Sequence, residues 1–253
     1  MGEAQDARFE YLLRLGDNAL ILSHRLSEWC GHGPVLEEDL ALANVALDLL
    51  GQAQFWLDYA GELEGRGRDA DALAYRRDVW DFRNVLLVEQ PNGDYAETIA
   101  RQFYFDAWHL LLLSGLAGST DPRIAEIAEK GLKEVKYHLD RSQLWVVTLG
   151  DGTDESHDRM QRAINGFWEY TGELFEVDEV DSALAATGVA PDLTQLVEPW
   201  RAAVAETLQQ ATLEMPQASW IHSGGKKGIH SESLGFILAE MQFLQRAYPE
   251  ATW

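Results

Sequence analysis

The sequence is poor in cysteine and in basic residues, and each shortage excludes a class of protein. Cys30 is the single cysteine among 253 residues, so no intrachain disulfide can form and a reducing compartment fits. The 20 lysines and arginines are outnumbered by 42 acidic residues, which gives a formal net charge of −22. A surface of that sign repels nucleic acid and anionic lipid, so we expect neither nucleic acid nor a membrane as a partner.

The sequence also lacks long hydrophobic runs. The longest, such as residues 110–113, fall far short of the roughly 20 residues that a membrane-spanning helix needs. Residues 1–5 show no basic region followed by an apolar stretch, which argues against a signal peptide and predicts a cytoplasmic location. Because the chain has no Gly-x-Ser-x-Gly element, hydrolase chemistry gets no support.

What the sequence does contain is a series of long periodic segments, with proline and glycine clustered between them. A hydrophobic content of 46% with 25% charged residues suits a globular chain with a large core. The pattern predicts an all-α protein with almost no sheet. We expect helices at about 6–30, 36–63, 70–78, 95–117, 122–149, 155–175, 192–214 and 231–247.

Local signals mark several helix ends. Gly31, Gly33 and Pro34 separate the first two helices, and this short connection predicts antiparallel neighbours. Asp94 and the pair Asp121-Pro122 are typical of helix N-termini, because the carboxylate caps free N–H groups and proline is tolerated in the first turn.

A long crossover, residues 61–87, separates the first helical hairpin from the next. Such a crossover is typical of ferritin-like four-helix bundles. We therefore expect one domain over 1–253, with a core bundle at about 6–149 and additional helices at about 155–247.

Four of these segments each carry one acidic residue within an apolar stripe. In a carboxylate-bridged di-iron bundle, two helices give a lone carboxylate and two give Glu-x-x-His. Here the histidine positions, three residues after Asp48 and Glu134, hold Gly51 and Tyr137. The metal-site positions, which we interpret as degenerate, are Asp17, Asp48, Gly51, Asp106, Glu134 and Tyr137. We assign no catalytic residue and no metal ligand to this chain.

Inward-facing carboxylates are costly to bury unless something neutralises them. Three explanations stay open: a metal pair, pairing with histidines or with Lys133 and Lys136, or protonation through raised pKa values. Helical spacing predicts a buried polar cluster of His24, Asn44, His109 and His138.

Several segments together resemble a known family, the structural C-type subunits of bacterial phenylacetyl-CoA monooxygenase (ring 1,2-phenylacetyl-CoA epoxidase). The residues that carry the resemblance lie at 15–17, 22–34, 37–44, 48–53, 133–138, 228–232 and 240–249. The match runs along almost the whole chain.

The resemblance implies a ferritin-like structural subunit that pairs with a homologous catalytic subunit, in a complex with further subunits. The di-iron site and the CoA-thioester pocket would lie on that partner, and a flavin and iron-sulfur reductase would deliver the electrons. The complex would epoxidise the aromatic ring of phenylacetyl-CoA with O2 and NADPH, which is a step of aromatic degradation. This chain would hold no cofactor.

Two rival hypotheses remain open from the residues. The chain would be a self-sufficient di-iron oxygenase if an unusual ligand set, Asp17, Asp48, Asp106, Glu134 and His138, bound the metals. Alternatively it would act alone as a ferritin-like homodimer. In the glycine-rich stretch 220–228, Lys226 and Lys227 are candidates for contact with a partner or with the phosphates of CoA.

Overall fold

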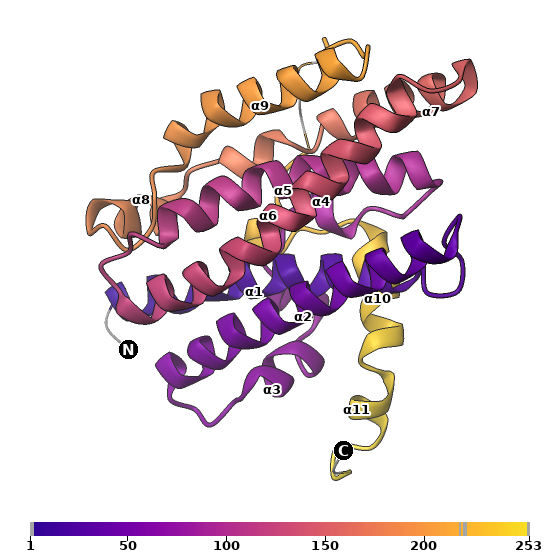
Figure 1. Cartoon of the computed structure of the whole chain (residues 1–253). Helices are drawn as coiled ribbons and strands as arrows, with labels where there is room; N and C mark the ends of the chain where they lie inside the picture. Colours follow the sequence, from indigo (N-terminus) through magenta and orange to yellow (C-terminus); the bar gives the residue numbers. More distant parts are fainter. Residues whose placement is uncertain (1–2, 218, 220–221, 252–253) are drawn as a thin grey trace. The chain divides into compact units, whose positions relative to one another are not determined.

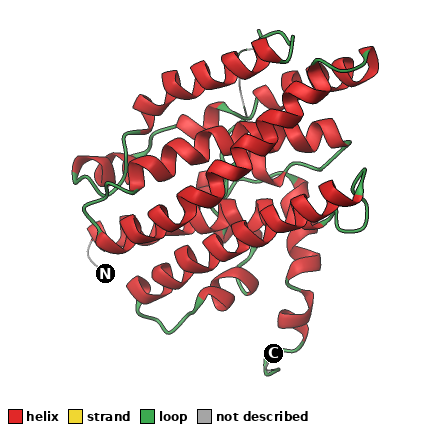
Figure 2. Ribbon diagram, in the orientation of Figure 1, coloured by secondary structure: helices red, strands yellow, loops and turns green. Residues whose placement is uncertain are grey.

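The chain folds into two compact helical units. The computed structural model describes residues 3–217, 219 and 222–251. Unit 1 comprises Met1–Pro91 and Ser223–Trp253, and unit 2 comprises Asn92–His222. Helices and loops make up all of the described residues, without a strand (Figure 2), so the all-α prediction is confirmed. The single domain over 1–253 stays a prediction.

Unit 1 is built on the hairpin of α1 (Glu3–Ser27) and α2 (Leu36–Glu64), which lie side by side and antiparallel (Figure 1). The two helices approach closely at Gly16, where a Cβ atom would lie 2.6 Å from Cδ2 of Leu57. The crossover adds α3 (Ala70–Tyr75), the 3-10 turn η1 (Val79–Asp81) and α4 (Leu86–Glu89). The C-terminal segment then contributes η4 (Gly225–Lys227), α10 (Glu232–Met241) and α11 (Phe243–Ala247).

Unit 2 is built on α5 (Tyr95–Leu116) and α6 (Pro122–Gly150). It continues through α7 (Asp154–Trp168), η2 (Gly172–Phe175), α8 (Glu179–Ala186), η3 (Leu193–Leu196) and α9 (Val197–Gln210). Tyr104 joins three of these helices, because its hydroxyl donates to the Ile164 carbonyl on α7 at 3.0 Å and its own carbonyl accepts from Trp200 Nε1 on α9 at 3.1 Å. The aromatic residues of this unit thus form much of its core.

The expected helix ends hold to within a few residues for α1, α2, α5 and α6, whereas the helix expected at 155–175 ends at Trp168 and is followed by η2. Both predicted caps are confirmed: Asp94 accepts from the Glu97 N–H at 3.0 Å, and Asp121 accepts from the Arg123 N–H at 3.0 Å. The expected helix at 231–247 is divided at Gln242 into α10 and α11, and the one at 192–214 consists of η3 and α9. The short helices α4 and α8 were not predicted, since four and eight residues are too few for a clear period.

By length and composition, α2 is the one helix among the described residues that is apolar enough to cross a membrane, which differs from the sequence expectation. Core helices of soluble proteins pass the same test, so the finding is weak evidence. The apolar residues of α2 lie on two different faces, one buried and one exposed.

Two glycines of α2 should respond in opposite ways to alanine. A Cβ atom at Gly51 would meet nothing within 4 Å, whereas one at Gly61 would lie 2.0 Å from the Arg68 carbonyl oxygen. We expect Gly51→Ala to stabilise the chain by about 0.5–1 kcal/mol, because alanine loses less backbone freedom in a helix. Gly61→Ala should destabilise it by about 1–3 kcal/mol through overpacking. Thermal unfolding followed by circular dichroism measures both; a lower midpoint for Gly51→Ala would contradict the open space at that position.

Candidate functional site

Asp17 is buried in α1 and is neutralised by the crossover. The Arg77 guanidinium donates to both carboxylate oxygens, from Nη1 to Oδ2 at 3.0 Å and from Nη2 to Oδ1. The backbone N–H of Arg83 donates to Oδ2 at 2.8 Å. Both ionic side chains are almost fully buried, with exposed fractions of 0% for Asp17 and 4% for Arg77. The carboxylate is therefore held by an arginine fork and a backbone N–H.

Arg77 also ties this carboxylate to the C-terminal helices. Its guanidinium carbon lies 4.3 Å from the centre of the Phe82 ring, which is a cation–π contact. Its backbone carbonyl accepts from Gln242 Nε2 at 3.0 Å and from Arg246 Nη2 at 2.8 Å. The segment around Arg77 thus joins α1 to the end of the chain within unit 1.

The α2 positions of the expected metal site lie nearer the surface than the sequence stripe predicted. Asn44 is exposed, and Asp48 and Gly51 are half-buried. Placing Asn44 in a buried polar cluster was therefore wrong. The physical reason is that α2 carries apolar residues on two faces, so its pattern does not single out one face for the core. His24, on α1, is half-buried, and burial lowers the pKa of its imidazole.

In unit 2, Asp106 is fully buried and accepts hydrogen bonds from α5 and α6. Gln102 Nε2 donates to Oδ1 at 2.6 Å, and the Ser142 hydroxyl donates to Oδ2 at 2.8 Å. Burial raises the pKa of Asp106 to about 6, against the opposing effects of His138 and of the two hydrogen bonds. Among the three explanations considered from the sequence, a raised pKa applies here, and the two neutral donors stabilise the ionised form whenever the proton leaves.

The remaining expected site residues of unit 2 are spread between core and surface. His109 and His138 are buried, with 4% and 1% of their surfaces exposed. Burial lowers the pKa of His109 to about 3, so this ring is neutral at pH 7. Glu134 is half-buried, and Tyr137 is 50% exposed. Lys133 and Lys136, considered as partners of the acids, are both exposed.

These residues do not fit a di-iron centre. The oxygens of Asp17 and Asp106 already accept hydrogen bonds from side chains of the protein. Gly51 has no donor atom, and Tyr137 faces the surface. Within residues 3–217, 219 and 222–251, no group of three or more histidine, cysteine, aspartate or glutamate side chains is arranged to hold a metal ion.

Another buried carboxylate, Glu89 at the end of α4, was missed by the sequence analysis. Its side chain accepts from Asn84 Nδ2 at 2.9 Å and from the backbone N–H of Ser231 at 2.6 Å, and His230 Nδ1 lies 2.8 Å from Oε2. His230 Nε2 lies 3.0 Å from the Phe82 carbonyl oxygen, and because a carbonyl carries no proton, Nε2 must donate. Glu89 therefore fastens the C-terminal segment to the crossover.

Little in the sequence indicated that arginines and a histidine would pair with Asp17 and Glu89. Arg77 and Arg83 stand in the irregular crossover, and His230 lies 141 residues from Glu89. Helical periodicity relates only residues of the same helix. Gln102, by contrast, lies one turn before Asp106 on the same face of α5, and sequence reasoning could have found it.

The glycine-rich basic segment docks against the crossover. A Cβ atom at Gly225 would lie 2.1 Å from the Asn84 carbonyl oxygen, so this position requires glycine. Lys226 is half-buried and Lys227 is exposed. Trp220 and Ile221, which belong to the same predicted stretch, lie outside the described residues.

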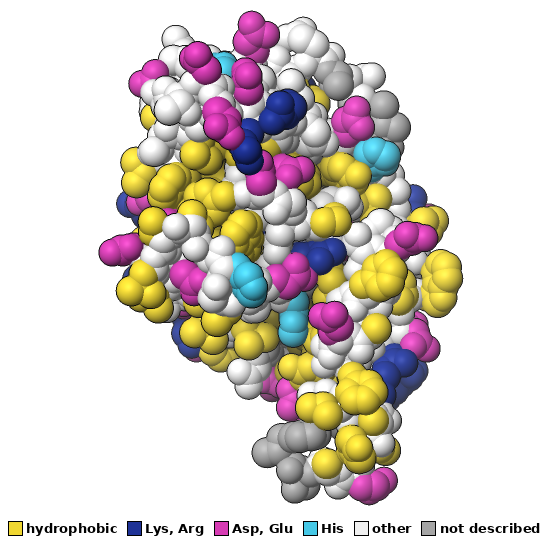
Figure 3. Space-filling view, turned by 90° about the vertical axis from the view of Figure 1, so that its right-hand side faces the viewer, with side chains coloured by type: hydrophobic (Ala, Val, Ile, Leu, Met, Phe, Trp, Pro, Cys, Tyr) yellow, Lys and Arg dark blue, Asp and Glu magenta, His cyan; other side chains and the backbone are white. Residues whose placement is uncertain are grey.

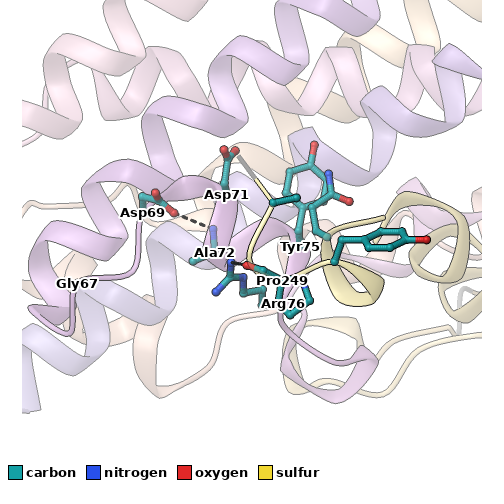
Figure 4. A pocket seen from close by; sticks show the side chains of 10 residues that line it. Gly67, Asp69, Asp71, Ala72, Tyr75, Arg76 and Pro249 are labelled. Atoms are coloured by element: carbon teal, nitrogen blue, oxygen red, sulfur yellow. Dashed lines mark hydrogen bonds between the residues drawn. The ribbon is translucent and has the colours of Figure 1, made fainter. Parts of the chain in front are cut away.

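A hollow of about 640 Å³ lies between α3 and the C-terminal segment of unit 1, lined among others by Asp69, Asp71 and Tyr75 (Figure 4). The dashed contact in Figure 4 joins the Asp69 carboxylate to the Ala72 N–H at 2.8 Å, which caps α3. Because the Asp69 carboxylate serves to cap α3, we assign no catalytic or binding role to this hollow.

The helical hairpins α1–α2 and α5–α6, the crossover between them and the acids in α1 and α5 define an all-α, ferritin-like protein with a metal-site pattern that lacks its histidines. The chain belongs to the family described as "Phenylacetic acid catabolic protein", which matches residues 1–253. It is 55% identical over 243 residues to the C component of 1,2-phenylacetyl-CoA epoxidase from Escherichia coli (strain K12), covering 96% of this chain and 98% of that protein. The resemblance stated from the sequence is confirmed.

Proposed function

We propose that this chain is the structural subunit of a 1,2-phenylacetyl-CoA epoxidase complex and does not itself carry out the oxygenation. The relative at 55% identity is a subunit of such an enzyme by name, and its length matches this chain almost completely. The proposal includes a cytoplasmic location and a role in aerobic phenylacetate breakdown.

The observation that carries the non-catalytic role is how the buried acids are satisfied. Asp17 is held by Arg77 and by the Arg83 N–H, and Asp106 by Gln102 and Ser142. A carboxylate that accepts an arginine fork resists transfer to a metal, because the buried cation would lose its partner. Acids that serve a di-iron site in related bundles serve here to hold helices together.

The partner in this proposal is a homologous subunit that carries the di-iron site and the substrate pocket. Further subunits and a reductase would complete the assembly, and the present chain would contribute no cofactor. The absence of imidazole from both Glu-x-x-His positions of this chain supports placing the iron on the partner.

Reconstitution tests the proposal. We expect the iron-bearing homologue, supplied with its other subunits and reductase, to lose about tenfold or more of its epoxidation rate when this chain is omitted, because an obligate partner depends on the complex for its folded state. Adding the chain back should restore the rate. Product formation from phenylacetyl-CoA is the measurement, and the Escherichia coli relative, added in place of this chain, is the positive control.

Iron analysis separates this role from that of a self-sufficient oxygenase. The isolated chain, purified from iron-supplemented cells, should bind iron well below one ion per chain and should not turn over phenylacetyl-CoA. Two irons per chain with oxygen-dependent turnover would refute the structural role.

A further inference from the structure

Helix α2 has two apolar faces, and only one of them is buried. Its buried residues recur at three- and four-residue spacing and pack beside α1: Leu42, Val45, Ala46, Leu49, Ala53, Trp56, Leu57 and Ala60. A second row, which we call the leucine seam, consists of Leu36, Leu40, Leu47 and Leu50, with exposed fractions of 71%, 56%, 64% and 39%. The two rows are about 120° apart around the helix, given about 100° per residue. The seam is thus a separate surface.

A groove adjoins the seam. It has a volume of about 360 Å³, and its lining includes Leu47, Leu50 and Gln54 of α2 with Ala74 and Tyr75 of α3. Gly51 also lines it, and because a Cβ atom there would meet nothing within 4 Å, the missing side chain leaves that part of the groove open. Leucines at one edge and the Tyr75 ring at the other give it apolar surface, and Asp71 adds an acidic group to the lining.

The spacing of the seam fits a helix as its occupant. Together with Ala43, the leucines follow the alternation of four and three residues that places side chains along the contact line of two helices. From Leu36 to Leu50 the seam is about 21 Å long, at 1.5 Å per residue. That length offers about four turns to a helix laid along it.

The charges of α2 favour one kind of helix. Within its 29 residues there are seven acidic residues and not one lysine or arginine. Six of the acids are exposed or half-buried, namely Glu37, Glu38, Asp39, Asp48, Asp58 and Glu62, whereas Glu64 is buried and pairs with Arg68. The face drawn in Figure 3 likewise shows more acidic than basic side chains. A second copy of α2 would bring acid against acid, and an anionic lipid surface would be repelled in the same way.

We propose that the leucine seam and its groove bind a basic amphipathic helix of the iron-bearing partner subunit. This inference rests on the function proposed above and adds the surface through which the structural subunit acts. Leucines bury the apolar stripe of the partner helix, and exposed acids of α2 such as Glu37 and Glu62 attract lysines and arginines beside that stripe.

The first experiment compares two leucines of equal exposure. Leu47 on the seam and Leu144 on α6 are both 64% exposed, so aspartate at either position should leave the fold intact. We expect Leu47→Asp to raise the Kd for the purified iron-bearing subunit by about 10- to 100-fold, as for the loss of one buried leucine. Leu144→Asp should change it less than about threefold, and thermal unfolding of both variants controls for folding. Equal effects of the two substitutions would overturn the proposal.

The second experiment identifies the occupant directly. A benzophenone amino acid in place of Leu47 in the assembled complex should cross-link to a partner segment with apolar residues every three or four positions and lysine or arginine beside them. A cross-link to a second copy of this chain, or to a partner segment without basic residues, would overturn the proposal. The proposal would also be overturned if the wild-type chain bound phosphatidylserine vesicles and Leu47→Asp abolished this binding. That result would indicate that the leucine seam contacts a membrane.

The experiments distinguish a failure of this inference from a failure of the proposed function. If the wild-type chain forms no complex with the iron-bearing subunit, the proposed function fails. If the complex forms and restores epoxidation, but both aspartate variants behave as wild type, the function stands and the leucine seam is not the interface.

Discussion

Replacing Arg77 with methionine is expected to lower the free energy of unfolding by about 3–5 kcal/mol, because the buried Asp17 carboxylate would lose its cation. Both oxygens of Asp17 now accept hydrogen bonds from this guanidinium. Methionine keeps the aliphatic part of the side chain, but it lacks the guanidinium that also contacts the Phe82 ring. Equilibrium urea unfolding at pH 7 measures the loss.

Two further variants show whether the buried charge is the cause. The double variant Asp17→Asn with Arg77→Met should recover about half of the loss or more, since no unpaired charge remains buried. The neighbouring Arg76 is exposed, and Arg76→Met should change stability by less than about 0.5 kcal/mol. If Arg77→Met costs no more than Arg76→Met, the ion pair is not a major stabilising contact.

The second large effect is a loss of stability in acid that comes from His109. The pKa of its imidazole falls from 6.5 to about 3 on folding, so between these values the unfolded chain binds more protons than the folded one. The stability that depends on neutral His109 is complete above pH 6.5 and is lost as the pH falls toward 3. The full effect is about 5 kcal/mol, from 1.36 kcal/mol per pKa unit.

Asp106 acts in the opposite direction over an overlapping range. Its pKa rises from 3.8 to about 6 on folding, so the folded chain holds an extra proton between these values, and this contribution to stability falls by about 3 kcal/mol as the pH rises through them. We therefore expect His109→Gln to gain stability relative to wild type at pH 4, and Asp106→Asn to gain at pH 7. Urea unfolding between pH 4 and pH 8 compares each variant with wild type; an unchanged pH profile for His109→Gln would refute the assignment.

The helices and their caps could be predicted because the signals are local. Asp94 and Asp121 bond N–H groups two and three residues away, and each was recognised from its place before a periodic segment. The end of α1 at Ser27 and the break between α10 and α11 were less accurate, since helix ends depend on tertiary packing.

The partners of the buried acids were much harder to predict. Arg77 reaches Asp17 across 60 residues, from a segment with no period of its own. Asn44 was misplaced for another reason: α2 has apolar residues on two faces, and the sequence does not say which of them meets the interior. The sequence pattern thus indicated that acids would be buried in α1 and α5. Which groups would neutralise their carboxylates depends on the three-dimensional fold.

The division of unit 1 into two stretches of chain has a consequence for biosynthesis. Residues Asn92–His222 form unit 2 between them, so the ribosome completes unit 2 before it releases the partners that unit 1 needs. The Glu89 carboxylate can contact His230 only after another 141 residues have been synthesised. The Arg77 carbonyl can accept from Gln242 only after another 165. Unit 1 therefore reaches its full set of contacts only after all of unit 2 has been synthesised.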